Sequence, residues 1–270
     1  GVSNKKLVTE TSSMARLRLI ARLDVKAPHL IKGTQLEGLR KVGDPHDFAK
    51  EYFRQGVDEI IYMDVVASLY GRNSLNEIIE KTTEDIFVPI TVGGGVRTSE
   101  DVAKLLQVGA DKVAINTAAT ARPELISELS RRFGSQCVVL SIEAKQQPGG
   151  KWEAFTDNGR EPTGLDVIQW AKYGEELGAG EILVTSVDCE GTRGGFDIPL
   201  MRKVNEAVNI PVITSGGMGA HEHAVSLLRE TDLSAIAMAD ILHFKRSDLS
   251  SIRASLNEQG FLTRQPGEDQ

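Results

Sequence analysis

The sequence is poor in cysteine, in basic charge and in long apolar runs. Two cysteines in 270 residues are too few for a disulfide framework, which favours reduced thiols in a cytoplasmic protein. No segment approaches the roughly 20 apolar residues of a membrane span, and no secretory apolar segment is evident. The net charge of −7, from 31 Lys and Arg against 38 Asp and Glu, argues against nucleic acid, whose phosphates need a basic face.

Short apolar or β-branched runs recur along the chain and alternate with helical patterns. We predict eight strands, at 19–25, 59–63, 88–92, 112–115, 137–142, 181–187, 211–214 and 235–238. Strands that alternate with helices pair in parallel, so eight units predict an α/β fold, a (β/α)8 TIM barrel, with a doubly wound sheet as the alternative. We expect the barrel over 15–262, a disordered extension or cloning remnant over 1–14 and a flexible tail over 263–270.

The two halves of the chain are similar to each other. Residues 88–118 align with residues 210–240 without a gap. Matching stretches place three pairs of residues opposite one another: Gly94 and Gly216, Gly95 and Gly217, Asp24 and Glu143. This self-similarity predicts a barrel built from two half-barrels, each with the same kind of site.

Carboxylates occupy most of the predicted strand ends, where barrels of this class place their chemistry. The eight ends are Asp24, Asp64, Gly93–Gly95, Asn116–Thr117, Glu143, Asp188, Gly216–Gly217 and Asp240. One carboxylate alone could simply accept hydrogen bonds from loop amides, but five at one mouth repel each other, which points to a chemical role. Glu143 stands out, because a buried strand leads into it and Glu is rarely buried without a partner.

The paired glycines at two strand ends favour anion binding. Each pair ends a strand and opens a helix, where bare backbone N–H groups face outward. Two such pairs at corresponding positions of the repeat predict a ligand with a phosphate at each end. The alternative is that the glycines only form tight turns and bind nothing. His221 and His223 lie two apart and do not share a helix face, so we expect no metal and no cofactor. We expect His243 to be packed or capping.

Two segments are expected to extend over the mouth. A long loop follows the first strand, at 26–45, and a hairpin around Trp152 follows the fifth. Long loops on the catalytic face of a barrel often fold over ligand.

Several motifs together resemble the cyclase subunit of imidazole glycerol phosphate synthase. They include "LDVK", "IKGT", "VGGGV", "GADKVAINTAA", "GAGEILVTSVD" and "SGG", within a region from about Arg16 to Gly260. The resemblance implies a lyase of histidine biosynthesis, docked on a glutaminase whose ammonia crosses the barrel. At the mouth, ammonia meets a phosphorylated ribulosyl aminoimidazole precursor, which gives imidazole glycerol phosphate and aminoimidazole carboxamide ribotide.

The resemblance also assigns roles to residues. Asp24 matches one of two catalytic aspartates, and Glu143 stands where the second is expected. The implied substrate and phosphate ligands are Lys32, Gly94, Gly95, Asn116, Thr117, Thr185, Glu190, Gly191, Gly216, Gly217, Ala239 and Asp240. The implied ammonia gate is Arg18, Glu59, Lys112 and Glu181. From sequence alone, a plain salt-bridge plug explains these four charged residues equally well.

The chain departs from this family at the mouth. Glu143 is one methylene longer than the expected aspartate, and a misplacement of about 1 Å can cost on the order of a hundredfold in rate. Arg22 replaces a small cysteine and would favour the charged form of a nearby carboxylate. Glu190 and Asp240 replace an Asp and a Ser. We therefore expect phosphate to prefer the first half-site, unless Asp240 turns outward or pairs with a cation such as Arg193.

Three hypotheses for function follow. The first is an ammonia-dependent cyclase with Asp24 and Glu143 as its acid–base pair. The second is a paralogue that channels ammonia to a different phosphorylated or nucleotide-linked acceptor, for instance to form an amidine on a sugar. The third is a non-catalytic partner that only activates or scaffolds a glutaminase.

Overall fold

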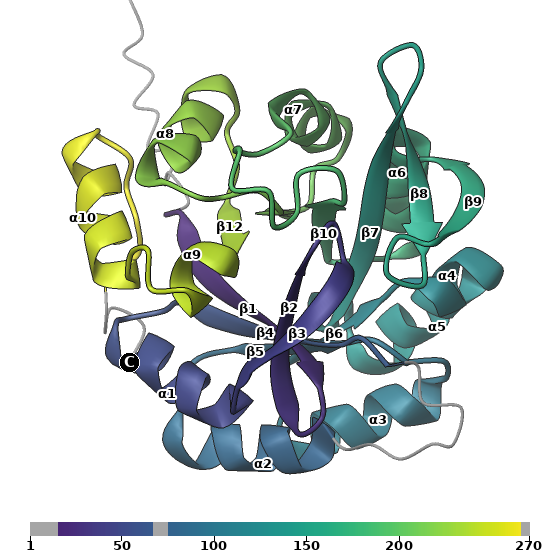
Figure 1. Cartoon of the computed structure of the whole chain (residues 1–270). Helices are drawn as coiled ribbons and strands as arrows, with labels where there is room; N and C mark the ends of the chain where they lie inside the picture. Colours follow the sequence, from purple (N-terminus) through teal and green to yellow (C-terminus); the bar gives the residue numbers. More distant parts are fainter. Residues whose placement is uncertain (1–15, 67–74, 266–270) are drawn as a thin grey trace, which may run out of the picture.

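In the computed structural model, which describes residues 16–66 and 75–265, the chain forms a closed barrel (Figure 1). Neighbouring strands are hydrogen-bonded in parallel in the order β1, β4, β5, β6, β7, β10, β11, β12, and β12 pairs with β1 to close the ring. The strands are β1 Arg18–Lys26, β4 Glu59–Asp64, β5 Ile90–Gly93, β6 Lys112–Ile115, β7 Val138–Gln147, β10 Glu181–Ser186, β11 Val212–Ser215 and β12 Ala235–Met238. The predicted (β/α)8 fold and its eight strands are confirmed.

Helices surround the barrel and pack their apolar faces on the outside of the strands (Figure 1). They are α1 Pro45–Arg54, α2 Leu75–Asp85, α3 Ser99–Val108, α4 Thr117–Ala121, α5 Glu124–Phe133, α6 Val167–Leu177, α7 Ile198–Ala207, α8 His221–Glu230, α9 Asp240–His243 and α10 Leu249–Glu258, with a 3₁₀ turn at Ser135–Cys137. Polar residues fix several helix starts. Asp44 accepts the backbone N–H groups of His46 and Asp47 at the start of α1, which satisfies donors that the first helical turn leaves free. Among residues 16–66 and 75–265, no helix is long and apolar enough to cross a membrane.

Side chains inside the barrel form three layers of different chemistry. Successive strand residues point to opposite faces, so Arg18, Ile20, Arg22 and Asp24 of β1 all point inward. Ile20 belongs to a buried apolar cluster with Ile61, Met63, Ala114, Val139, Leu183, Ile213, Ala235 and Ala237. A charged layer lies below this cluster, at the strand starts, and a polar layer lies above it, at the strand ends.

The segment expected to be a long loop over 26–45 is instead mostly a hairpin, which corrects that prediction. Strands β2, His29–Thr34, and β3, Glu37–Gly43, pair antiparallel, and β2 also pairs with β1. The turn uses Gln35 and Leu36 at φ of 53° and 63°, a conformation that sequence signals assign to Gly or Asn. The hairpin lies across the barrel in Figure 1. Lys32 lies on β2 and forms an ion pair with Glu190.

The hairpin predicted around Trp152 is present. It consists of β8, Lys151–Thr156, which pairs antiparallel with β7, and of β9, Glu161–Asp166. Trp152 is buried, and its indole Nε1 donates to Asp197 Oδ2 at 2.8 Å. Asp197 also accepts from Gln146 Nε2 at 3.2 Å and from the backbone N–H of Leu200 at 3.2 Å, so one buried carboxylate joins the hairpin to the start of α7.

The C-terminal end of the fold lies a little beyond the predicted boundary at 262. Thr263 is buried and pairs with Leu17, and the N–H of Arg264 donates to the carbonyl of Leu17 at 3.2 Å. The described chain therefore contributes to the barrel floor as far as residue 264. The extension expected over 1–14 and the rest of the expected tail, 266–270, lie outside the described residues.

Replacing Asp197 with Ala should destabilise the fold by about 2–4 kcal/mol, because it removes a helix cap and leaves the buried Trp152 N–H without its acceptor. The matched control is Asp248→Ala at the start of α10, a partly exposed cap that should cost about 1 kcal/mol. Urea unfolding of both variants measures the difference. Equal losses would show that the link between hairpin and α7 contributes nothing.

Candidate active site at the barrel mouth

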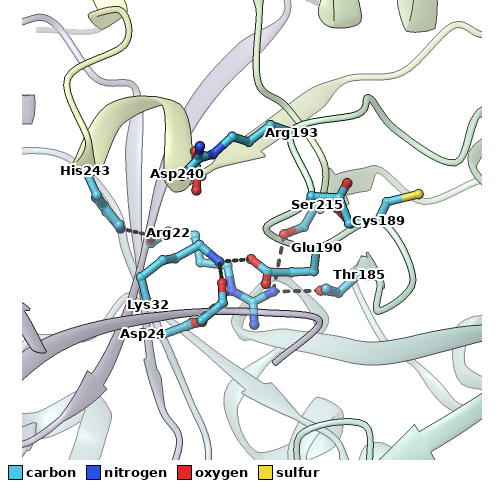
Figure 2. Close-up of polar contacts among 12 residues, drawn as sticks. Arg22, Asp24, Lys32, Thr185, Cys189, Glu190, Arg193, Ser215, Asp240 and His243 are labelled. Carbon is cyan, nitrogen blue, oxygen red and sulfur yellow. Dashed lines mark hydrogen bonds and ion pairs between the residues drawn. The ribbon is translucent and has the colours of Figure 1, made fainter. Parts of the chain in front are cut away.

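Arg22 lies at the centre of the polar layer and joins three strands of the barrel. It is 6% exposed, and its Nε donates to Asp24 Oδ1 at 3.0 Å. Its Nη1 donates to Thr185 Oγ1 at 2.6 Å and to Ser215 Oγ at 3.2 Å (Figure 2). The guanidinium therefore covers the apolar interior from above. The ion pair with Arg22 holds the Asp24 carboxylate in a fixed position at the mouth.

Glu143, on β7, is the counterpart of Asp24 in the second half of the chain. It is a buried carboxylate whose environment differs from that of Asp24. It is 7% exposed, and its Oε2 accepts the backbone N–H of Gly159 at 2.8 Å. Burial raises the pKa of Glu143 to about 7, against the opposing effects of the Gly159 N–H and Arg22, and the charges of Asp24 and Asp157 raise it further. A carboxyl group with this pKa exchanges protons at neutral pH, which is the property of a general acid or base.

A cavity of about 580 Å³ opens beside Glu143, on the side of the first half-barrel. Its size is that of a small-molecule site. The predicted phosphate ligands Gly94, Gly95, Asn116 and Thr117 all line it. Gly94 has a φ of 90°, and a Cβ there would lie 2.0 Å from the carbonyl oxygen of Asp64, so only glycine keeps the loop this close to the strand end.

The corresponding region of the second half-barrel is filled by side chains. Only about 10 Å³ of free space remains beside Gly191, Gly216, Gly217 and Ala239. Asp240 is buried there, and its Oδ1 accepts from Arg193 Nε and from Arg246 Nε, each at 3.0 Å. The exception attached to the sequence prediction therefore applies: Asp240 pairs with Arg193, so repulsion by an unpaired Asp240 does not argue against phosphate here. The remaining argument is the lack of space. The second arginine, Arg246, was missed by the sequence analysis.

Lys32 reaches the mouth from the β2–β3 hairpin and faces this second half. Its Nζ donates to the carbonyl of Gly33 at 3.0 Å and forms a short ion pair with Glu190 Oε1 (Figure 2). Both side chains are buried, and burial raises the pKa of Glu190, an effect that Lys32 opposes. The other oxygen of Glu190, Oε2, is buried without a hydrogen-bond partner in the described chain.

Asp188 and Asp64, like Glu143, accept backbone N–H groups. Asp188 Oδ2 accepts the N–H of Gln146 at 2.8 Å, which fixes the end of β7, and it is absent from the lining of both half-sites. Asp64 Oδ1 accepts the N–H of Val66 at 3.0 Å, but Asp64 also lines the large cavity, and burial raises its pKa. A purely structural role, in which the carboxylate only accepts backbone hydrogen bonds, therefore accounts for Asp188 fully and for Asp64 in part.

His243 is packed in the interior, as expected, and His223 caps the start of α8. His243 is 4% exposed, its Nε2 lies 3.1 Å from the carbonyl of Arg22, and Tyr52 contacts its Nδ1. Burial lowers the pKa of His243 to about 4, so the ring is neutral, donates from Nε2 and accepts from Tyr52 at Nδ1. His223 Nδ1 accepts the backbone N–H groups of Gly219 and Ala220.

Some residues of the site carry no signal that the sequence analysis used. The large cavity is also lined by Arg97, Arg122, Asp157 and Asn158. Arg97 lies two residues after the first glycine run, so its position close to a strand end could have identified it. Asn158 comes from the β8–β9 turn, where Nδ2 donates to the carbonyl of Val65 at 3.0 Å, a long-range contact that spacing does not reveal.

The four charged residues at the barrel floor form one ring. Arg18 donates to Glu59 Oε2 at 2.5 Å and also to Glu181. Lys112 Nζ donates to Glu59 Oε1 and to Glu181 Oε1, each at 3.0 Å. The ring thus alternates in sign, carries no net charge, and closes the floor beneath the apolar cluster.

The chain matches the model of the family of histidine biosynthesis proteins over residues 18–248. It is similar to imidazole glycerol phosphate synthase subunit HisF of Legionella pneumophila, at 64% identity over 209 residues, which cover 77% of this chain and 99% of that protein. It is also similar to subunit HisF of Corynebacterium glutamicum, at 46% identity over 254 residues, which cover 92% and 98%. The chain therefore belongs to the family of histidine biosynthesis proteins, whose barrel its fold displays. Within that family it is HisF-like, so the resemblance drawn from its motifs is confirmed.

Replacing Glu143 with Gln should change how stability depends on pH. The folded protein holds the Glu143 proton more tightly than the ordinary value of 4.5 implies, so this group stabilises the fold below about pH 4.5 and loses that effect as pH rises to about 7. Between pH 4.5 and 8, the free energy of unfolding of the wild type should fall by up to about 3 kcal/mol relative to the variant, since one pKa unit is about 1.4 kcal/mol.

Urea unfolding of both proteins across this range measures the effect. Glu222→Gln, at an exposed carboxylate of α8, is the control and should leave the curve unchanged. Parallel curves for the wild type and Glu143→Gln would contradict the assigned pKa.

Proposed function

We propose that this chain is the ammonia-dependent cyclase of an imidazole glycerol phosphate synthase. In this reaction a ribulosyl aminoimidazole carboxamide precursor and ammonia give imidazole glycerol phosphate and aminoimidazole carboxamide ribotide. The observation that carries the proposal is the arrangement of Asp24 and Glu143, two buried carboxylates with different partners at the mouth of one barrel. The similarity to HisF subunits supports it.

The different environments of the two carboxylates assign their roles. When ammonia condenses with a carbonyl group, an acid must protonate the oxygen that leaves as water, and a base must take the proton lost when the ring closes. Glu143, with its pKa raised to about 7, holds a proton to donate near neutral pH. Asp24 is held in place at the mouth by the guanidinium of Arg22 and is therefore positioned to accept one. We therefore assign Glu143 as the acid and Asp24 as the base.

The interior of the barrel is suited to bring ammonia to these groups. The charged ring at the floor lies below the apolar cluster, and Arg22 lies above it. Neutral ammonia enters an apolar interior more easily than ammonium, because a buried charge carries a large desolvation penalty. We propose that Arg18, Glu59, Lys112 and Glu181 form the gate, that a glutaminase subunit docks beneath it, and that the complex works in the cytoplasm.

The proposal predicts that the purified chain, supplied with an ammonium salt and the ribulosyl precursor, releases the carboxamide ribotide. Asp24→Asn should lower kcat by about 10²–10⁴-fold, the usual contribution of a general acid or base. Asp188→Asn is the matched control, because Asp188 is a strand-end carboxylate that accepts a backbone N–H at the end of β7 and lines neither half-site. Its activity should stay within a few-fold of the wild type.

Three results would speak against this account. No turnover at any pH would refute the cyclase. If Asp24→Asn left every activity of the glutaminase complex unchanged, the chain would be a non-catalytic partner. Equal losses in Asp24→Asn and Asp188→Asn would show that the mouth is merely sensitive to substitution.

A second candidate keeps the ammonia path and changes the acceptor. The filled second half-site favours it, because Asp240 and its two arginines occupy the region where a second phosphate is expected. In this case the acceptor is a different phosphorylated or nucleotide-linked compound. The first candidate requires the second half-site to hold a phosphate, and the second candidate does not.

A further inference from the structure

The two half-sites at the mouth differ in the space that they offer. The first half-site, at Gly94 and Gly95, opens into the cavity of about 580 Å³. The second, at Gly216 and Gly217, retains about 10 Å³, roughly the space of one water molecule. All four glycines have positive φ, from 68° to 112°, so the loops are alike in this respect and the difference lies in the side chains.

Asp240 is the side chain that distinguishes the second half-site. In the gap-free alignment of the two halves, it stands opposite Ala118, which lines the open cavity. Asp240 is 7% exposed and is held by the Nε atoms of Arg193 and Arg246 (Figure 2 shows it with Arg193). A carboxylate between two guanidinium groups is a stable arrangement, so an incoming anion must compete with it for the same cations.

Glu190 adds a second carboxylate to this half-site. Its Oε1 is engaged by Lys32, and its buried Oε2 has no partner within the described part of the chain. An ionised phosphate oxygen only accepts hydrogen bonds, so it cannot satisfy Oε2 and would also meet like charge. A hydroxyl group or a water molecule can donate to Oε2 and fits the small space that remains.

We infer that this barrel holds its substrate through one phosphate, at the first half-site, and that Asp240 excludes a second phosphate from the second half-site. The inference rests on the second candidate of the proposed function and narrows the substrate class of that candidate, because the precursor of the first candidate carries a phosphate at each end. The preferred substrate carries a phosphate at one end and presents a hydroxyl group to Glu190 at the other. Asp240 is then a specificity-determining residue of the second half-site, and Ala118 stands at the corresponding position of the first.

Binding of inorganic phosphate tests the inference without any knowledge of the acceptor. Crystals grown or soaked in phosphate, together with calorimetric titration, should show one phosphate in the wild type, at Gly94 and Gly95. Asp240→Ser should bind a second phosphate, at Gly216 and Gly217. The reciprocal variant Ala118→Asp should lose the first. Asp232→Ser removes the same charge from an exposed position and should bind one, like the wild type.

Three outcomes would overturn the inference. Two phosphates on the wild type would show that Asp240 does not exclude an anion from the second half-site. No phosphate on the wild type would show that the first half-site is not a phosphate site. A single phosphate on a folded Asp240→Ser variant would show that Asp240 is not what excludes the second.

Kinetics separates this inference from the proposed function. For the precursor with a phosphate at each end, Asp240→Ser should lower KM on the order of tenfold while kcat stays within a few-fold, because only binding of the remote end changes. No turnover by the wild type or by the variant would refute the cyclase, while the phosphate count still decides the inference. Turnover with the same KM in both proteins would overturn the inference and leave the cyclase standing.

Discussion

The contact between Arg22 and Asp24 is the constraint on which the mouth of this barrel depends. A guanidinium that is 6% exposed must find partners for its charge and its N–H groups, and it does so across β1, β10 and β11. These contacts fix Asp24 and separate the apolar interior from the site above. Removing Asp24 would leave a buried charge without its partner, so positioning and stability are coupled at this point.

The same constraint gives the two proposed catalytic carboxylates different electrostatic environments. Arg22 contacts Asp24 directly, whereas Glu143 receives one backbone N–H from Gly159 and is otherwise buried. Repeat symmetry would give the two positions equal chemistry, and one arginine on β1 makes them unequal. In the proposed mechanism, this difference is what makes one of the two an acid and the other a base.

Sequence reasoning predicted the features that rest on periodicity and failed where tertiary contacts decide. The alternation of strands and helices gave the barrel, and the short match of residues 22–26 with residues 141–145 placed Asp24 and Glu143 at corresponding strand ends. The β2–β3 hairpin was missed, because its turn places Gln35 and Leu36 at positive φ, against their intrinsic preference. Arg246 was missed because its contact with Asp240 depends on how the chain turns after α9.

The most direct test of the account is the pH dependence of kcat/KM for the ammonium-dependent reaction, corrected for the fraction of free ammonia. If Glu143 is the proton donor with a pKa of about 7, kcat/KM should fall as pH rises through about 7, and Glu143→Asp should move this limb. A profile without a limb near pH 7, or a limb that Glu143→Asp leaves in place, would contradict the assignment of Glu143 as the acid.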